Sequence, residues 1–207
     1  MKITVFGATG SIGKHVVSQA LDSGHIVTAV ARDPSKITRS DSRLETIVAD
    51  VLVNDSRLRN AVAGADAVII ALGDGMRGRV RAAGTKNIIA AMKSVGIKRL
   101  ICQSTLGAGE SFANLNWIWR FIFSVPLRKA MADHQLQERY VRECDFDWTI
   151  VRPAAFTDGD RTGQYRHGFD QHARKLTLKI ARADVADFMI RQLRESSYLR
   201  QASSLSY

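Results

Sequence analysis

The chain has 207 residues, and its 45% hydrophobic content is enough to build the core of one α/β domain. Thirty Lys and Arg residues against twenty Asp and Glu residues give a net charge of +10, which favours anionic partners such as phosphates, carboxylates, nucleic acid or an acidic membrane face. The basic residues form no Lys/Arg block and carry no zinc-finger or aromatic RNA-binding pattern, so nucleic acid is not expected as the partner.

Short apolar runs alternate with helical patterns along most of the chain. Strands are predicted at residues 2–6, 26–31, 44–49, 67–71, 99–103 and 148–151, and helices at residues 11–23, 55–63, 79–95, 130–144 and 183–193. Each strand is apolar throughout rather than alternating, which is typical of a parallel sheet buried on both faces. No linker or internal repeat interrupts the pattern, so residues 1–207 are predicted to form one doubly wound α/β domain with helices on both faces.

Two segments depart from this alternation, and we expect both on the substrate side, within residues 105–130 and 157–182. Residues 112–125 are rich in aromatic side chains and follow the fifth strand, so a lid, a dimer surface and buried core are all open interpretations. Residues 157–179 are polar and basic and include Tyr165, His167 and His172. The last dozen residues are polar, and the sequence does not predict that they are ordered.

The first strand leads directly into the turn Gly7-Ala8-Thr9-Gly10-Ser11-Ile12-Gly13. Gly7 permits a tight turn, Gly10 lets a pyrophosphate approach the main chain, and Gly13 lets the following helix pack closely on the strand. The helix then offers free N–H groups and its positive dipole end to phosphate. A glycine turn between a first strand and an amphipathic helix predicts a dinucleotide-binding fold of the Rossmann type.

The end of the second strand indicates which dinucleotide is bound. An NAD site usually carries an acidic residue there for the ribose hydroxyls, whereas this strand ends at Ala31 and continues into Arg32 and Lys36, which could hold a 2′-phosphate. NADP is therefore predicted over NAD. Asp33 leaves an alternative, because it could bind a ribose hydroxyl or cap the short turn at Pro34.

Residues after the third and fourth strands are further candidates for the cofactor site. Asp50 and Val51 are placed to contact the adenine, although Asp50 could equally be a cap or loop aspartate. Leu72 and Gly73 would lie beside the cofactor. The run of residues 73–78 looks mobile enough to close over it, and its arginines could also be ordinary solvated charge.

Taken together, these stretches resemble an atypical short-chain dehydrogenase/reductase, most similar to the biliverdin reductase B/flavin reductase family of NAD(P)H-binding, NmrA-like proteins. The matching residues are 7–13, 30–33, 50–52, 62–69, 87–93, 102–104, 133–134 and 184–189. The resemblance covers nearly the whole chain, and the set is specific although no single stretch is.

The resemblance implies residues for the reacting centre. Ser104 would lie near the nicotinamide and orient the substrate, and the alternative is that it only caps a loop. His134 would lie near the substrate, and the alternative is a surface or capping residue. Cys102 occupies the family's cysteine position but could be a small core residue. Backbone at Pro153, Ala154 and Phe156 would contact the nicotinamide carboxamide. The family has a second Pro and a His where this chain has Ala154 and Ala155, and the Trp117-Ile118-Trp119 insert is unlike the biliverdin-reducing members.

One familiar catalytic pair is missing. The better-known dehydrogenases of this superfamily use a Tyr-x-x-x-Lys pair, but Tyr140, Tyr165 and Tyr198 are followed four positions later by Cys, Phe and Ala, and Tyr207 ends the sequence. This favours hydride transfer to a small, planar conjugated acceptor, such as a flavin, a quinone or an anionic tetrapyrrole-like compound, which needs little acid catalysis. A non-catalytic NADP-binding redox sensor or assembly factor that uses the aromatic 112–123 surface is the alternative. An epimerase or dehydratase is a weaker one, because it ordinarily needs the missing pair.

Other patterns bear on the compartment and on metals. No apolar run approaches the roughly 18 residues of a spanning helix, and no basic-then-apolar leader precedes the first strand, so a cytoplasmic protein is expected, as a monomer or homodimer. The two cysteines are far apart, and the five histidines are scattered, so neither a disulfide scaffold nor a metal site is predicted.

Overall fold

A central, mostly parallel sheet organises the protein, which is described for residues 1–207 by a computed structural model. Its strand order is β3-β2-β1-β4-β5-β6-β10-β8, and every neighbouring pair is parallel except β10 with β8. The strands are β1 (Lys2–Phe6), β2 (Ile26–Ala31), β3 (Leu44–Val48), β4 (Ala67–Ile70), β5 (Arg99–Gln103), β6 (Asp147–Pro153), β8 (Arg166–His167) and β10 (Gln201–Ser206). A second, two-stranded parallel sheet joins β7 (Ala155–Thr157) to β9 (Lys179–Ala181).

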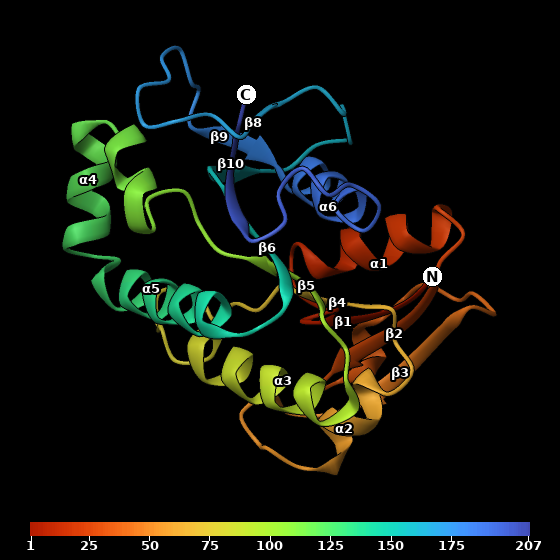
Figure 1. Ribbon diagram of the computed structural model, residues 1–207. Helices are drawn as coiled ribbons and strands as arrows, with labels where there is room; N and C mark the ends of the chain where they lie inside the picture. The colour runs from red at the N-terminus through yellow and green to blue at the C-terminus, as the bar shows by residue number, and fades with distance from the viewer.

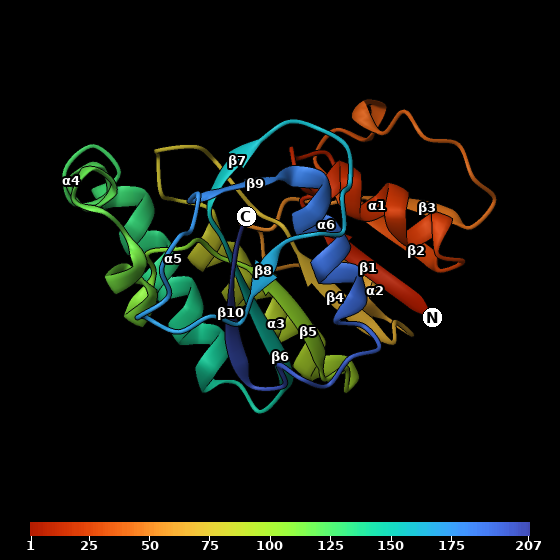
Figure 2. The same cartoon turned by 90° about the horizontal axis from the view of Figure 1, so that it is seen from above.

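Helices cover both faces of the central sheet, as the predicted doubly wound α/β fold requires (Figure 1). One layer contains α1 (Gly13–Asp22) and α6 (Arg182–Arg191), which lie side by side (Figure 2), and the other contains α2 (Ser56–Val62), α3 (Arg81–Val95) and α5 (Arg128–Glu143). Successive strand residues point to opposite faces, so Ile69 belongs to the core on the α1 side and Ile70 to the core on the α3 side.

Three short elements lie outside these layers. They are the 3₁₀ turns η1 (Pro34–Lys36) and η2 (Gly109–Asn114), and the helix α4 (Trp117–Ser124). Figure 2 shows α4 at the opposite end of the molecule from β3. No helix of the structure is both long enough and apolar enough to cross a membrane.

The predicted strands and helices are present, with ends that differ by a few residues, but not all strands are buried on both faces. β3 is the edge strand of the sheet, and Glu45, Thr46 and Val48 on it are exposed. The prediction of two buried faces is wrong for this strand, because an edge strand has a neighbour on one side only and is less covered by the helical layers.

The end of the chain is ordered, which the sequence by itself does not predict. β10 pairs in parallel with β6, with Ser203 opposite Val151, and its residues from Ser203 to Ser206 are buried. The hydroxyl of Tyr207 donates to the Asp184 carboxylate at 2.6 Å. The segment lacks the hydrophobic pattern of a strand, and the free edge of β6 supplies the hydrogen-bond partners that hold it in the sheet.

Candidate functional site

A polar groove of about 630 Å³ lies at the carboxyl ends of β1, β2 and β4. The strand order reverses between β1 and β4, and doubly wound sheets bind ligands at such a switch point. The groove brings together most of the residues that the sequence assigns to a cofactor: Gly7, Thr9, Gly10, Arg32, Lys36, Asp50, Val51, Leu72 and Gly73.

The glycines of the first turn are required by close backbone contacts. Gly7 has a φ of 81°, and a Cβ added there would overlap the carbonyl of Ala71 at the end of β4. A Cβ at Gly13 would overlap the carbonyl of Gly7, so this glycine lets α1 approach the turn. A Cβ at Gly10 would lie 3.1 Å from the Gly7 oxygen. Gly7 and Gly13 therefore have the packing roles that their spacing predicts, and approach of a pyrophosphate at Gly10 stays a prediction.

The start of α1 tests whether this turn fits a dinucleotide. No side chain caps the helix, and the N–H groups of Ser11, Ile12 and Gly13 donate to no backbone or side-chain acceptor. The side chain of Ile12 is buried, so this residue can contribute only its backbone. Free donors at a helix N-terminus, next to a turn without Cβ atoms, match a pyrophosphate. The residues at the start of α1 therefore fit the pyrophosphate of a dinucleotide.

The far end of the groove is basic. Arg32 is exposed and makes no ion pair, whereas the Lys36 amine lies 3.6 Å from the Asp33 carboxylate. Asp33 also accepts hydrogen bonds from the Ser35 amide and hydroxyl, at 3.2 Å and 2.6 Å. Of its two interpretations, the structure shows the cap of the turn at Pro34. Arg32 is left available to an anion.

Asp50 and Val51 form part of the groove wall. The Asp50 carboxylate accepts from the Leu52 amide at 3.0 Å, which is the loop-aspartate alternative, and the residue lines the groove as well. A glycine missed by sequence reasoning supports this wall from α3: a Cβ at Gly84 would lie 2.8 Å from Val51 and 2.9 Å from Leu72. The sequence signal that could have indicated this close packing is a glycine inside a predicted helix.

The loop between β4 and α3 is fastened at both ends. The Asp74 carboxylate accepts from the Arg79 amide at 3.0 Å and from the Arg81 guanidinium at 2.9 Å. Gly78, with a φ of 60°, lies so close to α5 that a Cβ would overlap the Lys129 carbonyl. The structure thus shows one anchored arrangement of the loop, and closure over a cofactor stays a prediction.

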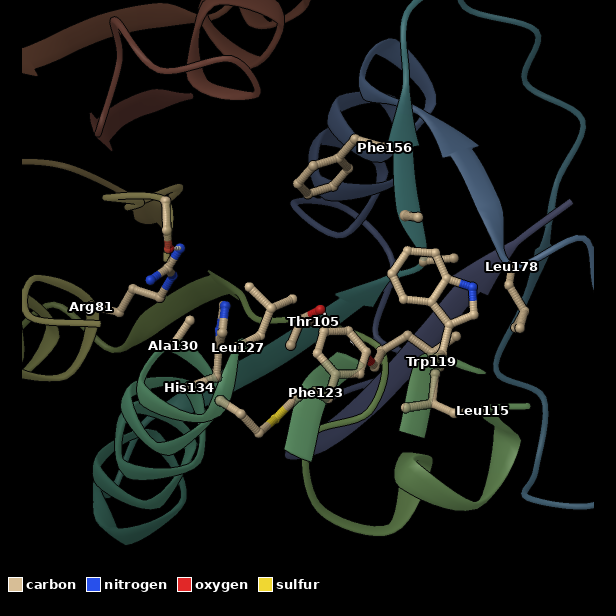
Figure 3. A pocket seen from close by; sticks show the side chains of 15 residues that line it. Arg81, Thr105, Leu115, Trp119, Phe123, Leu127, Ala130, His134, Phe156 and Leu178 are labelled. Carbon is tan, nitrogen blue, oxygen red and sulfur yellow. Dashed lines mark hydrogen bonds between the residues drawn. The ribbon is translucent and has the colours of Figure 1, made fainter. Parts of the chain in front are cut away.

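A second cavity of about 270 Å³ adjoins this loop and is mostly apolar (Figure 3). Its walls come from separate parts of the chain: Gly75, Arg81, Thr105, Leu106, Leu115, Trp119, Phe123, Leu127, Ala130, Met131, His134, Ala154, Ala155, Phe156 and Leu178. Residues 105–130 supply seven of these, whereas residues 157–182 supply only Leu178. His167 and His172 lie elsewhere, so the second predicted substrate-side segment contributes less than expected.

His134 is a polar group in this apolar wall, and it is uncharged. Burial, together with the nearby positive charge of Arg81, lowers the pKa of His134 to about 3. Its Nδ1 atom has no hydrogen-bond partner. The preceding residue fixes its position, because the Asp133 carboxylate accepts from the Arg81 and Ala82 amides at the start of α3, at 3.1 Å and 2.9 Å. The ring can therefore offer a neutral hydrogen bond to a ligand but not act as an imidazolium at neutral pH.

Ser104 and Cys102 do not reach either cavity. Ser104 is buried at the end of β5, and its hydroxyl has no partner, while the next residue, Thr105, is the one that lines the apolar cavity. Cys102 packs in the core on the α3 side, where burial raises the pKa of its thiol. The assignment of Cys102 to the cofactor is corrected to a small core residue, because it lies inside β5, is enclosed by the core and lines neither cavity.

The segment after β6 lies apart from the other residues predicted to bind the cofactor. Pro153 is buried in the strand, and its carbonyl accepts from the Leu106 amide at 2.8 Å. Ala154, Ala155 and Phe156 line the apolar cavity rather than the polar groove. Their side chains therefore belong to the apolar cavity, and contact of their backbone with a nicotinamide carboxamide stays a prediction.

None of the four tyrosines lines either cavity. Tyr165 donates to the Asp187 carboxylate at 2.6 Å, and burial together with this hydrogen bond raises the pKa of its hydroxyl. A tyrosine that gives up its proton at the site, as epimerase-type chemistry ordinarily needs, is absent.

Comparison with known proteins agrees with the geometry of the groove. Residues 7–196 match the model of a family described as NAD(P)H-binding. A photosystem II assembly factor, Ycf39 of Synechocystis, is 31% identical over 80% of this chain and 48% of its own length. A (4-alkanoyl-5-oxo-2,5-dihydrofuran-3-yl)methyl phosphate reductase of Streptomyces griseus is 27% identical over 74% of this chain and 48% of its own length. The chain thus spans about half the length of these two relatives.

Solved structures share the fold. A short-chain dehydrogenase/reductase from Veillonella parvula, solved in complex with NADP, superposes with a TM-score of 0.84. The alignment covers 100% of this chain and 94% of that chain, at 18% identity.

Proposed function

The chain belongs to the NAD(P)H-binding family, and on that premise we propose that it is an NADPH-dependent reductase of a planar, apolar acceptor. The observation that carries the proposal is that the polar groove and the apolar cavity meet at one loop. Leu72 and Gly73 line the groove, and Gly75 and Arg81 line the cavity. The residues present can therefore hold a dinucleotide on one side of this loop and an acceptor on the other.

Arg32 is the basis for preferring NADP over NAD. Its guanidinium is exposed in the groove without an acidic partner, so it is free to bind a 2′-phosphate through charge-assisted hydrogen bonds. Lys36 adds positive charge at the same end, although Asp33 offsets part of it. The helix start at Ser11, Ile12 and Gly13 would take the pyrophosphate.

The acceptor is held by shape and apolar contact. When bound, NADPH supplies a hydride, and a quinone acceptor that takes up this hydride and one proton leaves as the quinol, with NADP⁺ as the other product. Trp119 and Phe123 line the cavity and offer aromatic faces to such a ring. Neutral His134 and the Thr105 hydroxyl would orient a carbonyl by hydrogen bonds, and solvent would supply the proton. We propose Thr105 rather than Ser104 as the hydroxyl contact, because it lines the cavity.

The direct test is NADPH oxidation with FMN, riboflavin, quinones and biliverdin as acceptors. We expect turnover with a flavin or quinone, and loss of acceptor binding in Trp119→Ala. Trp117→Ala is the matched control, because this residue lies on the same helix but points outward and is 78% exposed. If no acceptor supports NADPH oxidation, the reductase assignment is wrong.

A non-catalytic, NADP-binding assembly factor is the second candidate. The exposed aromatic residues of α4 favour it, and a relative of 31% identity is named as an assembly factor. It predicts NADPH binding without turnover, and a co-purifying partner that is lost in Trp117→Ala while NADPH affinity is unchanged.

The two cysteines, Cys102 and Cys144, are free and buried. Free thiols are typical of a reducing compartment, so we propose that the protein works in the cytoplasm.

A further inference from the structure

Helix α4 carries large apolar side chains on its outward face as well as its inward one. Trp117, Ile118, Phe121 and Val125 are 78%, 48%, 63% and 61% exposed. No residue of the helix is buried. Scattered exposed apolar residues are ordinary, but four within nine consecutive residues are typical of a contact surface.

The neighbouring loop extends this surface. Met76 is 65% exposed, and the loop's Gly78 is pressed against the beginning of α5. The loop and α4 both contribute to the apolar cavity, through Gly75 on one side and Trp119 on the other. The exposed apolar residues therefore lie on two segments that also form part of the cavity wall. We call residues 75–80 and 117–129 the rim.

The exposed charges of the rim are all positive. Residues 75–80 and 111–132 contain no Asp or Glu. The carboxylates that flank these segments in the sequence are already engaged, since Asp74 and Asp133 bind Arg81, and Glu110 binds Arg152 at 2.7 Å. The exposed basic residues of the rim are Arg120, Arg128 and Lys129, together with Arg77 and Arg79, which also line the polar groove.

This combination decides between possible occupants. A second copy of the chain in a two-fold interface would bring the same cluster of positive charges onto itself, which is repulsive. An anionic bilayer complements both the positive charge and the exposed apolar side chains of the rim. Its headgroups attract Lys and Arg, and its interface accepts Trp and Phe side chains.

We infer that the rim docks on an anionic membrane surface, and that the apolar cavity takes a lipophilic ring compound, such as a long-tailed quinone, from the bilayer. The docking stands on the exposed residues alone. The second part rests on the proposed reductase function.

Vesicle flotation tests the docking. The full chain should bind vesicles of phosphatidylcholine with phosphatidylglycerol but not phosphatidylcholine alone, and added salt should weaken the binding. We expect Trp117→Ser with Phe121→Ser to reduce the binding by about tenfold or more, because both side chains lose their interfacial contact. Ile26→Ser with Val48→Ser is the matched control, since these two apolar residues are each 49% exposed but far from the rim.

Two results would overturn the docking. One is vesicle binding that is absent or unaffected by the rim substitutions. The other is a concentration-dependent dimer that the same substitutions disrupt, which would make a second copy the occupant.

An activity assay separates this inference from the proposed function. With a water-soluble quinone, the rim variant should turn over like the unmodified chain, whereas with a long-tailed quinone embedded in anionic vesicles it should lose most turnover. Vesicle binding without turnover on either quinone would contradict the proposed reductase function and support the proposed membrane docking. Turnover on the water-soluble quinone with no preference for the embedded one, despite vesicle binding, would reject the bilayer as the source of the acceptor.

Discussion

The polar groove and the apolar cavity are built in different ways. The groove follows the turns after β1, β2, β3 and β4, and it carries the unpaired charge of Arg32. The free N–H groups that begin α1 follow its glycine turn. The cavity is made of side chains from α4, α5 and the segments after β5 and β6, and its histidine is neutral.

The difference teaches how each space selects a ligand. Backbone donors and glycines fix one shape, which suits a constant ligand such as a dinucleotide. Side-chain walls change with each substitution, which suits an acceptor that differs between relatives. Substitutions in the two regions should therefore separate cofactor binding from acceptor binding, and the predictions below test this separation.

Gly7→Ala should have the largest effect. The new Cβ would meet the Ala71 carbonyl, so we expect NADPH binding to be lost and the protein to be destabilised by about 1–3 kcal/mol. Gly24→Ala is the control, because Gly24 has a similar φ of 80° but open space around it. It should lower stability and leave NADPH affinity unchanged. Equal loss of NADPH binding in both variants would show that backbone strain, and not the close contact, governs the turn. Fluorescence titration and thermal melts give the two readouts.

Arg32→Ala should come next and should affect only the groove. We expect NADPH binding to weaken by about 1–3 kcal/mol, the range for a hydrogen bond to a charged group, with NADH binding nearly unchanged. Arg43→Ala is the matched control, because Arg43 pairs with Asp41 at 2.9 Å and does not line the groove. An equal loss for NADPH and NADH would contradict the assignment of Arg32 to the 2′-phosphate.

Trp119→Ala should affect the apolar cavity and leave the polar groove unchanged. Removing an aromatic wall of the cavity should raise KM for the acceptor by about tenfold, corresponding to about 1.4 kcal/mol of lost contact, while the Kd for NADPH stays the same. Steady-state kinetics and NADPH titration measure the two constants. A weakened Kd for NADPH would show that the two spaces are not independent.

His134→Gln should have the smallest effect at neutral pH and a larger one in acid. The native pKa of about 3 lies below the ordinary value of 6.5, so the folded protein resists protonation. Stability from the neutral ring is complete above pH 6.5 and falls as the pH drops from there toward 3, by at most about 1.4 kcal/mol for each pH unit. The variant should lose this part of the pH dependence in denaturant titrations, and exposed His172→Gln should keep it. If the slope persists in His134→Gln, another group causes it.

Much of the groove could be predicted because its signals are local. The spacing of Gly7, Gly10 and Gly13 requires only one strand and one helix, and Arg32 follows the next strand directly. Each of these residues lies at the carboxyl end of a predicted parallel strand, which places them at one edge of the sheet. The role of Gly84 was not predicted, because its close approach to Val51 and Leu72 joins α3 to residues well before it in the chain.

The cavity could be predicted only in part. The aromatic segment was recognised as unusual, but its periodicity did not show that Trp119 points inward while Trp117 and Phe121 point outward. The resemblance implies Ser104 and does not point to Thr105, because the side-chain direction at a strand end depends on how the following loop turns. The uncharged state of His134 also depends on burial and on Arg81, which is far away in sequence.

The sequence by itself determined the alternation of strands and helices, the phosphate turn and the basic residue after the second strand, because hydrophobic period and glycine spacing act over a few residues. Only the tertiary structure decided the rest. It placed the serine-rich C-terminal strand β10 beside β6, where the edge of a strand rather than an apolar pattern holds it. It also assembled the cavity and its basic rim, since contacts between distant segments determine which side chains are buried and which face outward.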